Sequence, residues 1–341
     1  MKRNQSGFTL IELMISIVIV GIMLAIASSA ISNAFTYMQS AKRNENVRNM
    51  QKLAGGLMNF AQSYNGGRLP APYTGGTSFL AVYNPADVSA AGNALSMELR
   101  NTGIPVNLIN FDSAAVSNVR VYQRVSGLTY TTPFYISSGP AVTLTYDVGS
   151  LTQTECGVAS ACNAAIPGDS VAMTAANVTT WIPAGTDYGG IVFSTLPAQK
   201  DLLRQTVGRM NRLSDRLASE FYTRMRLAAA NSAMNFFPAP NNGGAPVLSG
   251  ANPTTNRGCH DGWYSLNAAN VNVLTQLGLD QTEFGVTGFG GSIQYCRDYE
   301  PTAVSGATAN TPPHYAALRI NRDLSAAGAP TGTATDVVVT F

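Results

Sequence analysis

The chain begins with its longest regular pattern, an apolar run over residues 8–31. One charged residue, Glu12, interrupts this run. As a helix the run extends roughly 36 Å, which is enough to cross the roughly 30 Å apolar core of a bilayer. The sequence therefore predicts a membrane-spanning helix at the start of the chain.

The helical pattern continues beyond the apolar run, now with a single apolar face. Its apolar positions recur at steps of three and four residues: Val47, Met50, Ala54, Leu57, Ala61 and Tyr64. Asn65, Gly66 and Gly67 end the pattern, and Pro70 follows. We expect one helix over residues 8–64, about 85 Å long, whose outer half packs against the rest of the protein.

Alternating apolar and polar positions begin near residue 118. Val119, Val121 and Val125 alternate with polar side chains, as do the apolar positions between residues 142 and 148. Turn-forming residues at 126–127 and 138–140 divide this region into three runs. The pattern predicts a three-stranded antiparallel meander with one buried face.

A second helical pattern starts near Pro197 and ends near residues 236–238. Its apolar positions repeat with a period of about 3.6 residues: Leu203, Val207, Met210, Leu213, Leu217, Phe221, Met225 and Ala228. Short strand candidates follow at residues 292–297, 315–320 and 336–341. The order of a helix, a loop and a sheet therefore occurs twice along the chain.

These elements predict an α+β fold, in which a long N-terminal helix carries a head of antiparallel sheet. Two arrangements of the head are open: two helix-plus-sheet modules in tandem, or one module followed by an unrelated domain. We divide the chain into a leader at residues 1–7, the long helix at 8–66, a first head module at 67–195 and a second helix-plus-sheet module at 196–341.

The composition limits the class of protein. Charged residues make up only 12% of the chain, which is low for a cytosolic enzyme, and the apolar content is too high for a disordered chain. Lys2 and Arg3 precede the apolar run, so the positive-inside rule places the N-terminus in the cytoplasm and the head outside it. The remaining acids and bases balance, so no net charge favours nucleic acid as a partner.

Three ordinary explanations of the apolar run compete. A secretory signal peptide has a basic start and an apolar core, and Ala25-Ile26-Ala27 fits a cleavage site. A single-pass anchor and a buried core helix are the others. The first two leave Glu12 unexplained, because a carboxylate inside a membrane costs about 2.5–3.5 kcal/mol and normally marks a function. A buried core helix fits neither the length of the run nor its basic flank.

The segment Ser6-Gly7-Phe8-Thr9-Leu10-Ile11-Glu12 resembles the prepilin cleavage and methylation site of type IV pilins and type II secretion pseudopilins. The resemblance implies that a prepilin peptidase cuts after Gly7 and N-methylates Phe8. It also implies that Glu12 pairs with the N-terminal amine of a neighbouring subunit during assembly. Many major pilins have a proline within this helix, whereas here the first proline is Pro70, which favours a pseudopilin or a minor pilin.

The resemblance implies a structural subunit without enzymatic activity. Its partners would be the prepilin peptidase, other pilin or pseudopilin subunits and, before assembly, the inner membrane, with the head outside the cytoplasm. The final location would be a pilus or a periplasmic pseudopilus. Because the head is bulky, a minor or tip component is favoured. The alternatives are a tip adhesin or substrate-binding module, and an anchored extracytoplasmic enzyme.

The four cysteines indicate disulfides rather than a metal centre. None forms a CxxC pair, and two histidines are too few to complete a typical zinc site. For an exported head we expect two disulfides, Cys156–Cys162 and Cys259–Cys296, because each pair then lies within one half of the chain. Free buried thiols are the alternative.

Other candidate chemistry is sparse, and we expect no cofactor and no metal site. The second helix has seven basic residues, Lys200, Arg204, Arg209, Arg212, Arg216, Arg224 and Arg226, but interspersed acids favour a solvated face or subunit contact over nucleic acid. His260 beside Cys259 gives little support for catalysis, and we expect His314 in a surface loop. Asp280 and Glu283 are the acids we considered for calcium, without predicting a site there.

Overall fold

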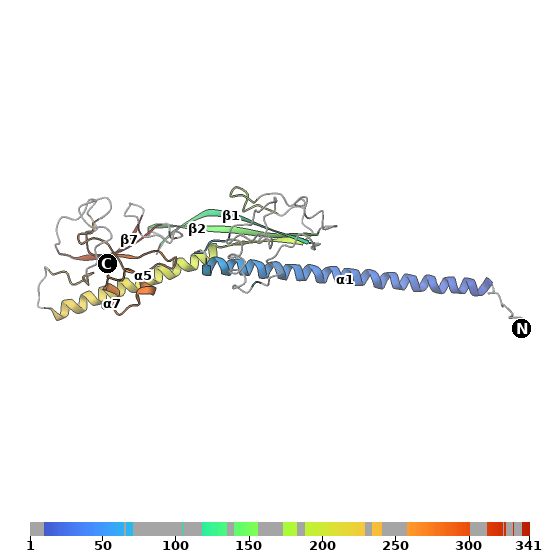
Figure 1. Ribbon diagram of the computed structural model, residues 1–341, viewed down its shortest axis with the longest axis horizontal. Coiled ribbons are helices and arrows are strands. Elements are labelled where there is room, and N and C mark those ends of the chain that lie inside the picture. Colours follow the sequence, from blue (N-terminus) through green and yellow to red (C-terminus); the bar gives the residue numbers. More distant parts are fainter. Residues whose placement is uncertain are drawn as a thin grey trace, which may run out of the picture.

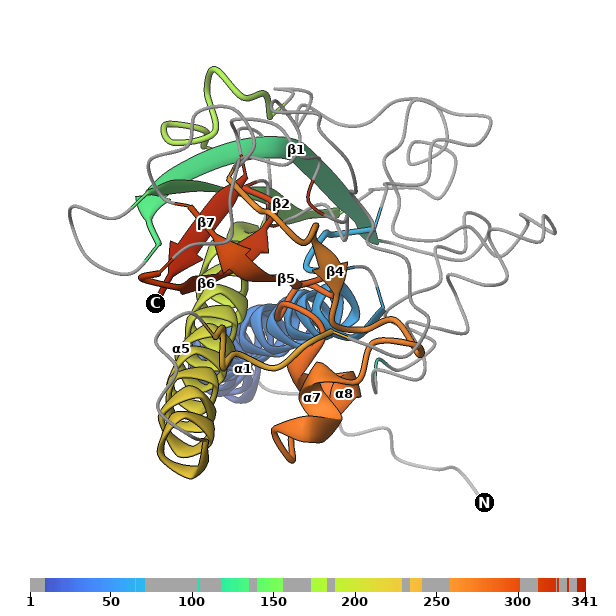
Figure 2. The ribbon, with the colours of Figure 1, turned by 90° about the vertical axis from the view of Figure 1, so that its left-hand side faces the viewer.

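The computed structural model describes residues 10–64, 66–70, 104, 118–134, 140–155, 173–182, 188–228, 234–240, 258–300, 312–322, 324, 330 and 336–341. The fold is α+β, as predicted. The two long helices lie on one side and the strands of two antiparallel sheets lie on the other (Figure 1, Figure 2).

The first helix, α1 (Leu10–Tyr64), has 55 residues and is about 83 Å long. Only its C-terminal part packs against the head, where Met50, Leu53 and Leu57 are completely buried. The predicted apolar face is correct for Met50, Ala54, Leu57 and Ala61, whereas Val47 stays 40% exposed. A Cβ at Gly56 would lie 2.0 Å from Ile104, so this glycine allows the close contact.

The first sheet consists of β1 (Asn118–Pro133), β2 (Ala141–Glu155) and β3 (Tyr188–Ser194), paired in that order. The predicted strand boundaries were wrong here. The two runs on either side of Ser126 and Gly127 form one strand, because these residues make a bulge at which the register shifts. The third strand is β3, which the alternation between residues 118 and 148 did not indicate.

The second unit starts with α5 (Leu196–Leu227), and its sheet has the strand order β4-β5-β6-β7. Its further elements are β4 (Tyr264–Ser265), α7 (Val273–Gln276), α8 (Gln281–Phe284), β5 (Gln294–Tyr299), β6 (Tyr315–Ile320) and β7 (Val337–Thr340). The three longer strands match the predicted candidates. The order of a helix and a sheet recurs, but the two sheets differ in strand number, and a duplication is not shown.

The hairpin of β1 and β2 is long enough to contribute to both hydrophobic cores. At one end Tyr122 and Leu151 pack against α1. At the other end Phe134, Val142 and Leu144 join the core formed by α5 and the second sheet. The head is therefore not two independent units, because one hairpin belongs to the cores of both.

A buried carboxylate joins the end of α1 to the first sheet. Asp147 on β2 is completely buried, and its oxygens accept hydrogen bonds from Arg68 Nε at 3.0 Å and from Leu69 N at 2.9 Å. The backbone N–H of Gly127 donates to the same carboxylate at 3.2 Å. The bulge in β1 has a clear cause, since it turns this N–H toward Asp147, and Gly127 adopts the required positive φ of 79°.

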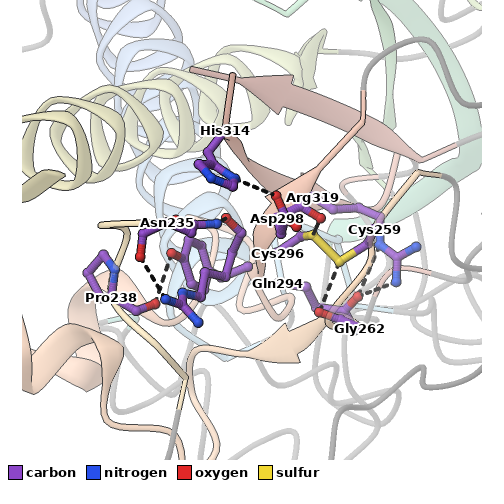
Figure 3. The surroundings of a disulfide bond; sticks show 11 residues. Asn235, Pro238, Cys259, Gly262, Gln294, Cys296, Asp298, His314 and Arg319 are labelled. Carbon is purple, nitrogen blue, oxygen red and sulfur yellow. Dashed lines mark hydrogen bonds and ion pairs between the residues drawn. A yellow bond between two sulfur atoms is a disulfide. The ribbon is translucent and has the colours of Figure 1, made fainter. Parts of the chain in front are cut away.

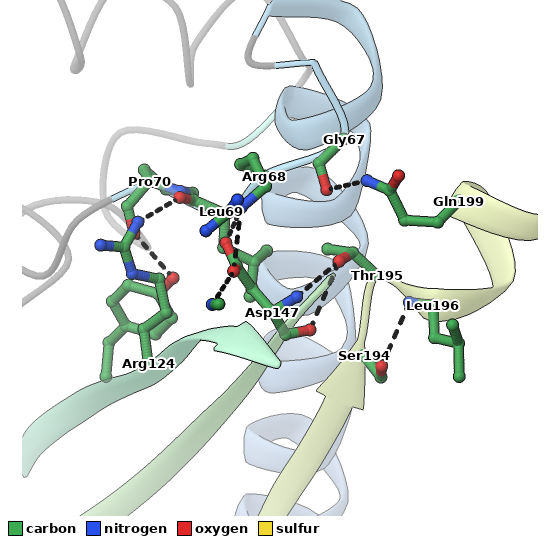
Figure 4. Close-up of polar contacts among 12 residues, drawn as sticks. Gly67, Arg68, Leu69, Pro70, Arg124, Asp147, Ser194, Thr195, Leu196 and Gln199 are labelled. Carbon is green, nitrogen blue, oxygen red and sulfur yellow. Dashed lines mark hydrogen bonds and ion pairs between the residues drawn. The ribbon is translucent and has the colours of Figure 1, made fainter. Parts of the chain in front are cut away.

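The backbone of Asp147 also binds the residue that precedes α5 (Figure 4). The backbone N–H of Asp147 donates to Thr195 Oγ1, and the backbone N–H of Thr195 donates to the carbonyl of Asp147, both at 2.9 Å. Gln199 Nε2 donates to the carbonyl of Gly67 at 2.8 Å. Asp147 and Gln199 therefore connect the end of α1, the first sheet and the start of α5, and we call this set of contacts the joint.

Replacing the buried carboxylate should destabilise the protein strongly. In Asp147→Ala the N–H groups of Leu69 and Gly127 lose their acceptor, and we expect the free energy of unfolding to fall by about 3 kcal/mol. Denaturant unfolding of the detergent-solubilised protein measures this loss. Asp201→Ala is the control, because its pair with Arg204 is exposed and should contribute less than about 1 kcal/mol. Similar small losses in both variants would contradict the role of the joint.

Candidate functional site

The N-terminal half of α1 projects from the head as a bare helix (Figure 1). Wherever its side chains are described, residues 11–45 are exposed. At 1.5 Å per residue this half of the helix extends about 54 Å from the head. The C-terminal part of α1 is therefore covered by the head, whereas nothing in the described chain covers the rest of the helix.

The exposed half is apolar around its whole circumference near the N-terminus. Large apolar side chains between residues 11 and 24 are each at least half exposed: Ile11, Leu13, Met14, Ile15, Ile17, Val18, Ile19, Val20, Ile22, Met23 and Leu24. A helix that is apolar on every side is normally buried in a protein interior or in lipid. So large an exposed surface marks an interaction site, and a soluble monomer would not leave it uncovered.

The predicted membrane span is not confirmed by the described residues. Over these residues, no helix is long and apolar enough to cross a membrane. The predicted run, residues 8–31, is described only from Leu10 onward and lacks several of its side chains.

The predicted processing and assembly residues lie at the edge of the described chain. Gly7 and Phe8 are outside the described residues. Glu12 lies in the first turns of α1, but its side chain is outside the described part. The backbone therefore places Glu12 near the free end of the exposed helix, far from the head.

Comparison with known proteins gives one match, and it falls on this end of the chain. Residues 2–28 match the family model of the prokaryotic N-terminal methylation motif. The chain thus has a pilin-type N-terminus. This agrees with the resemblance to type IV pilins and pseudopilins, and it supports processing by a prepilin peptidase and assembly with other pilins. No curated protein and no solved structure matches the chain.

The pilin-type motif does not extend to the head, where the structure forms one of the expected disulfides. Cys259 and Cys296 are bonded, with their Cα atoms 5.9 Å apart, and the bond links β5 to the segment before β4 (Figure 3). Cys156 and Cys162 lie outside the described residues. Both sulfur atoms of the described bond belong to buried residues, so Cys259 does not offer a free thiolate as a nucleophile.

A histidine and an aspartate lie beside this disulfide. His314 Nδ1 is 3.3 Å from Asp298 Oδ1, and the two side chains are only 3% and 4% exposed (Figure 3). His314 lies in a loop between exposed residues, as predicted, but its imidazole turns inward to this carboxylate instead of facing solvent. The pair is closed off from a substrate, so it contributes to packing and not to an accessible catalytic centre.

Charged groups around the disulfide affect one neighbouring carboxyl. Burial raises the pKa of Asp261, an effect that Arg297 partly offsets and the charge of Asp298 reinforces. Deeper in the sheet, Arg319 is completely buried and stacks on Trp263 at 4.3 Å. Its guanidinium donates two hydrogen bonds to Gln294 Oε1. These contacts join β5 to β6 in the protein interior. They form a structural network.

The basic residues of α5 mostly contact the protein itself. Five of the seven have such partners: Lys200 with the Tyr130 ring, Arg204 with Asp201, Arg209 with two carbonyls, Arg216 with the Leu277 carbonyl and Arg224 with Glu220. Lys200, Arg209 and Arg216 thus connect α5 to β1 and to the segments that follow α8 and α7. The ion pairs of Arg204 and Arg224 lie within α5. The absence of nucleic acid among the partners stays a prediction.

One of the two acids considered for calcium, Asp280, caps the start of α8. Asp280 precedes this helix, and its Oδ1 accepts hydrogen bonds from the backbone N–H groups of Thr282 and Glu283. The Thr282 hydroxyl also donates to it, and these bonds hold the pKa of Asp280 below its ordinary value. In the described chain, no group of three or more possible metal ligands comes together.

Removing the described disulfide should weaken the second sheet. The bond closes a separation of 37 residues, and the chain-entropy model assigns such a loop about 4 kcal/mol. We expect Cys259→Ala with Cys296→Ala to lower the free energy of unfolding by up to about this amount. The double variant Cys156→Ala with Cys162→Ala is a matched control, because the bond predicted there closes a shorter loop and should contribute about 2 kcal/mol. An equal or smaller loss for the longer loop would contradict the prediction.

Proposed function

We propose that this protein is a structural subunit of a type IV pilus or of a secretion pseudopilus. In this proposal a prepilin peptidase cleaves the precursor after Gly7 and methylates the new N-terminus at Phe8. The precursor is held in the inner membrane by the apolar end of α1, with the head outside the cytoplasm. The mature subunit then joins a filament through the same helix.

One observation carries the proposal, namely the division of α1 into a covered part and a bare part. From Met50 onward the helix is a component of the head core, whereas the described side chains of residues 11–45 are exposed. Lipid can cover the bare part before assembly, and neighbouring helices can cover it afterwards. The methylation motif lies on this same part of the chain, at residues 2–28, and supports the same conclusion.

Glu12 gives the assembly step its register. Cleavage after Gly7 creates a positively charged amine four residues before the carboxylate of Glu12. In a single helix the two groups lie in a poorly solvated region, and stacking of subunits brings an amine of one chain to the carboxylate of the next. Buried charge pairs are best known for setting register in this way.

The size of the head supports a minor or tip position. The described head contains a second long helix and a second sheet in addition to the unit formed by α1 and the first sheet. Such a head occupies more of the filament surface than a single helix-plus-sheet unit, so fewer copies fit side by side. No enzymatic role is proposed, because the buried pair of His314 and Asp298 and the bonded cysteines leave no accessible nucleophile and base there.

Cleavage and methylation can be tested directly on the membrane-extracted protein. We expect intact-mass and N-terminal peptide mass spectrometry to show a mature chain that begins at methylated Phe8. Gly7→Ala should retain the leader, because in this proposal the peptidase requires glycine itself before the cleaved bond. A chain that begins after Ala27, or an uncut Met1 in the wild-type protein, would contradict the proposal.

The assembly role of Glu12 has a matched control on the same helix. We expect Glu12→Gln to be cleaved normally but to enter filaments at least about tenfold less, since the charged pair between subunits is lost. Glu45→Gln removes an exposed acid from the same helix and should assemble as the wild type does. Quantitative immunoblots of sheared filaments against membranes measure the ratio. Equal incorporation of both variants would overturn the role of Glu12.

A further inference from the structure

Basic residues gather in the part of α1 where the bare helix meets the head. Residues 13–41 hold no charged residue, whereas residues 42–52 hold four bases and one acid, Glu45. We call the four bases, Lys42, Arg43, Arg48 and Lys52, the basic band. All four are exposed, and none forms an ion pair within the described part of the chain. The band therefore carries an excess of positive charge that these residues of the subunit do not neutralise.

The exposed apolar surface of α1 extends up to the basic band and into it. Phe35 is 61% exposed and Met38 is 59% exposed. Phe35, Met38 and Lys42 follow one another at steps of three and four residues, so their side chains share one face of the helix. Val47, which is 40% exposed, lies within the band. A partner that covers these apolar side chains also meets the band, which distinguishes the band from an ordinary solvated face.

A second copy of this chain is a poor partner for the basic band. Subunits that are anchored in one membrane by the same end have parallel helices, and the acids of α1 are Glu12 and Glu45. Glu12 is about 45 Å from Lys42 along the helix, so Glu45 is the acid that a parallel copy brings near the band. In the head, hydrogen bonds or ion pairs within the chain already engage Asp147, Asp201, Glu220, Asp280, Asp298 and Asp336.

Lipid headgroups are also a poor partner, because the basic band lies too far along the helix. In the proposed precursor the apolar run ends at Ile31, and Lys42 is about 16 Å beyond it along the helix. The headgroup region adds only about 5–8 Å to each side of the apolar core. The band therefore lies beyond the headgroups, at the level of neighbouring subunits.

We propose that the basic band packs against an acidic stretch of a different subunit of the same filament. This inference rests on the proposed function, because it takes the bare half of α1 as the assembly surface. Opposite charges across a contact select the partner, because like-charged neighbours are repelled. The band thus gives a low-copy subunit a defined neighbour and opposes stacking of this chain on its own copies.

Photo-cross-linking of the full chain in filament-assembling cells identifies the neighbour. Benzoylphenylalanine replaces Asn44, an exposed residue between Arg43 and Glu45, so that all four bases stay in place. After irradiation we expect an adduct with a second kind of subunit. Its cross-linked peptide, sequenced by mass spectrometry, should contain more acids than bases.

Charge variants test whether the basic band selects this neighbour. Lys42→Glu with Arg43→Glu should lower the cross-linked fraction at least about tenfold, because acids then face acids. Lys42→Arg with Arg43→Lys is the matched control, because it keeps both charges and should cross-link as the wild-type band does. Both positions are exposed, so we expect the thermal unfolding of the two variants to match that of the wild type.

Several results would overturn the proposal. They are an adduct with a second copy of this chain, an adduct with lipid, a cross-linked peptide without an excess of acids, and no adduct at all. Equal cross-linking of the two charge variants would also overturn it. None of these results bears on cleavage after Gly7 or on the role of Glu12. Failure of this inference is therefore distinguishable from failure of the proposed function.

Discussion

The buried carboxylate of Asp147 is the constraint on which the arrangement of the head depends. A completely buried carboxylate is tolerated only when donors surround it, and here they come from the chain after α1 and from the bulge of β1. The backbone of Asp147 also binds Thr195 at the start of α5. One residue thus ties the chain after α1, the first sheet and the start of α5 together, and the core around Met50, Leu53 and Leu57 holds α1 itself. In an assembled subunit the direction in which α1 leaves the head decides where the head lies on the filament.

The other constraint is the continuity of α1 through two different surroundings. Burial of Met50, Leu53 and Leu57 stabilises one end, and the exposed apolar half requires non-aqueous surroundings from the precursor to the filament. Moving from lipid to neighbouring helices gains little hydrophobic free energy, because acyl chains are as apolar as leucine. In the proposed filament, close packing and the charge pair of Glu12 would then supply the preference for assembly. That proposed role would account for an acid as costly as Glu12 in the apolar run.

The sequence was informative where structure depends on local pattern. The spacing of apolar residues and the residues that end helices and strands predicted α1, α5 and the three longer strands of the second sheet. The motif around Gly7 is a local pattern as well. Prediction failed where a distant partner decides the outcome. The turn signal at Ser126-Gly127 is a bulge, and Asp147 accepts the N–H of Gly127 there. The side chain of His314 leaves the surface of its loop and lies beside Asp298. Strand β3 has Gly189 and Gly190 at its second and third positions, and these glycines concealed its alternation of apolar and polar residues.

The connections in the head also imply how a load would pass through the subunit. A pull at the far end of α5 reaches α1 through the Gln199–Gly67 bond and the contacts of Asp147, and through the β1–β2 hairpin that enters both cores. Glycine is favoured at position 67 because its φ is 82°, and a Cβ there would displace the Gln199 amide from its bond to the Gly67 carbonyl. The disulfide limits how far the second sheet can extend. These hydrogen bonds and the shared hairpin therefore connect the second sheet and α5 to α1 by more than one route.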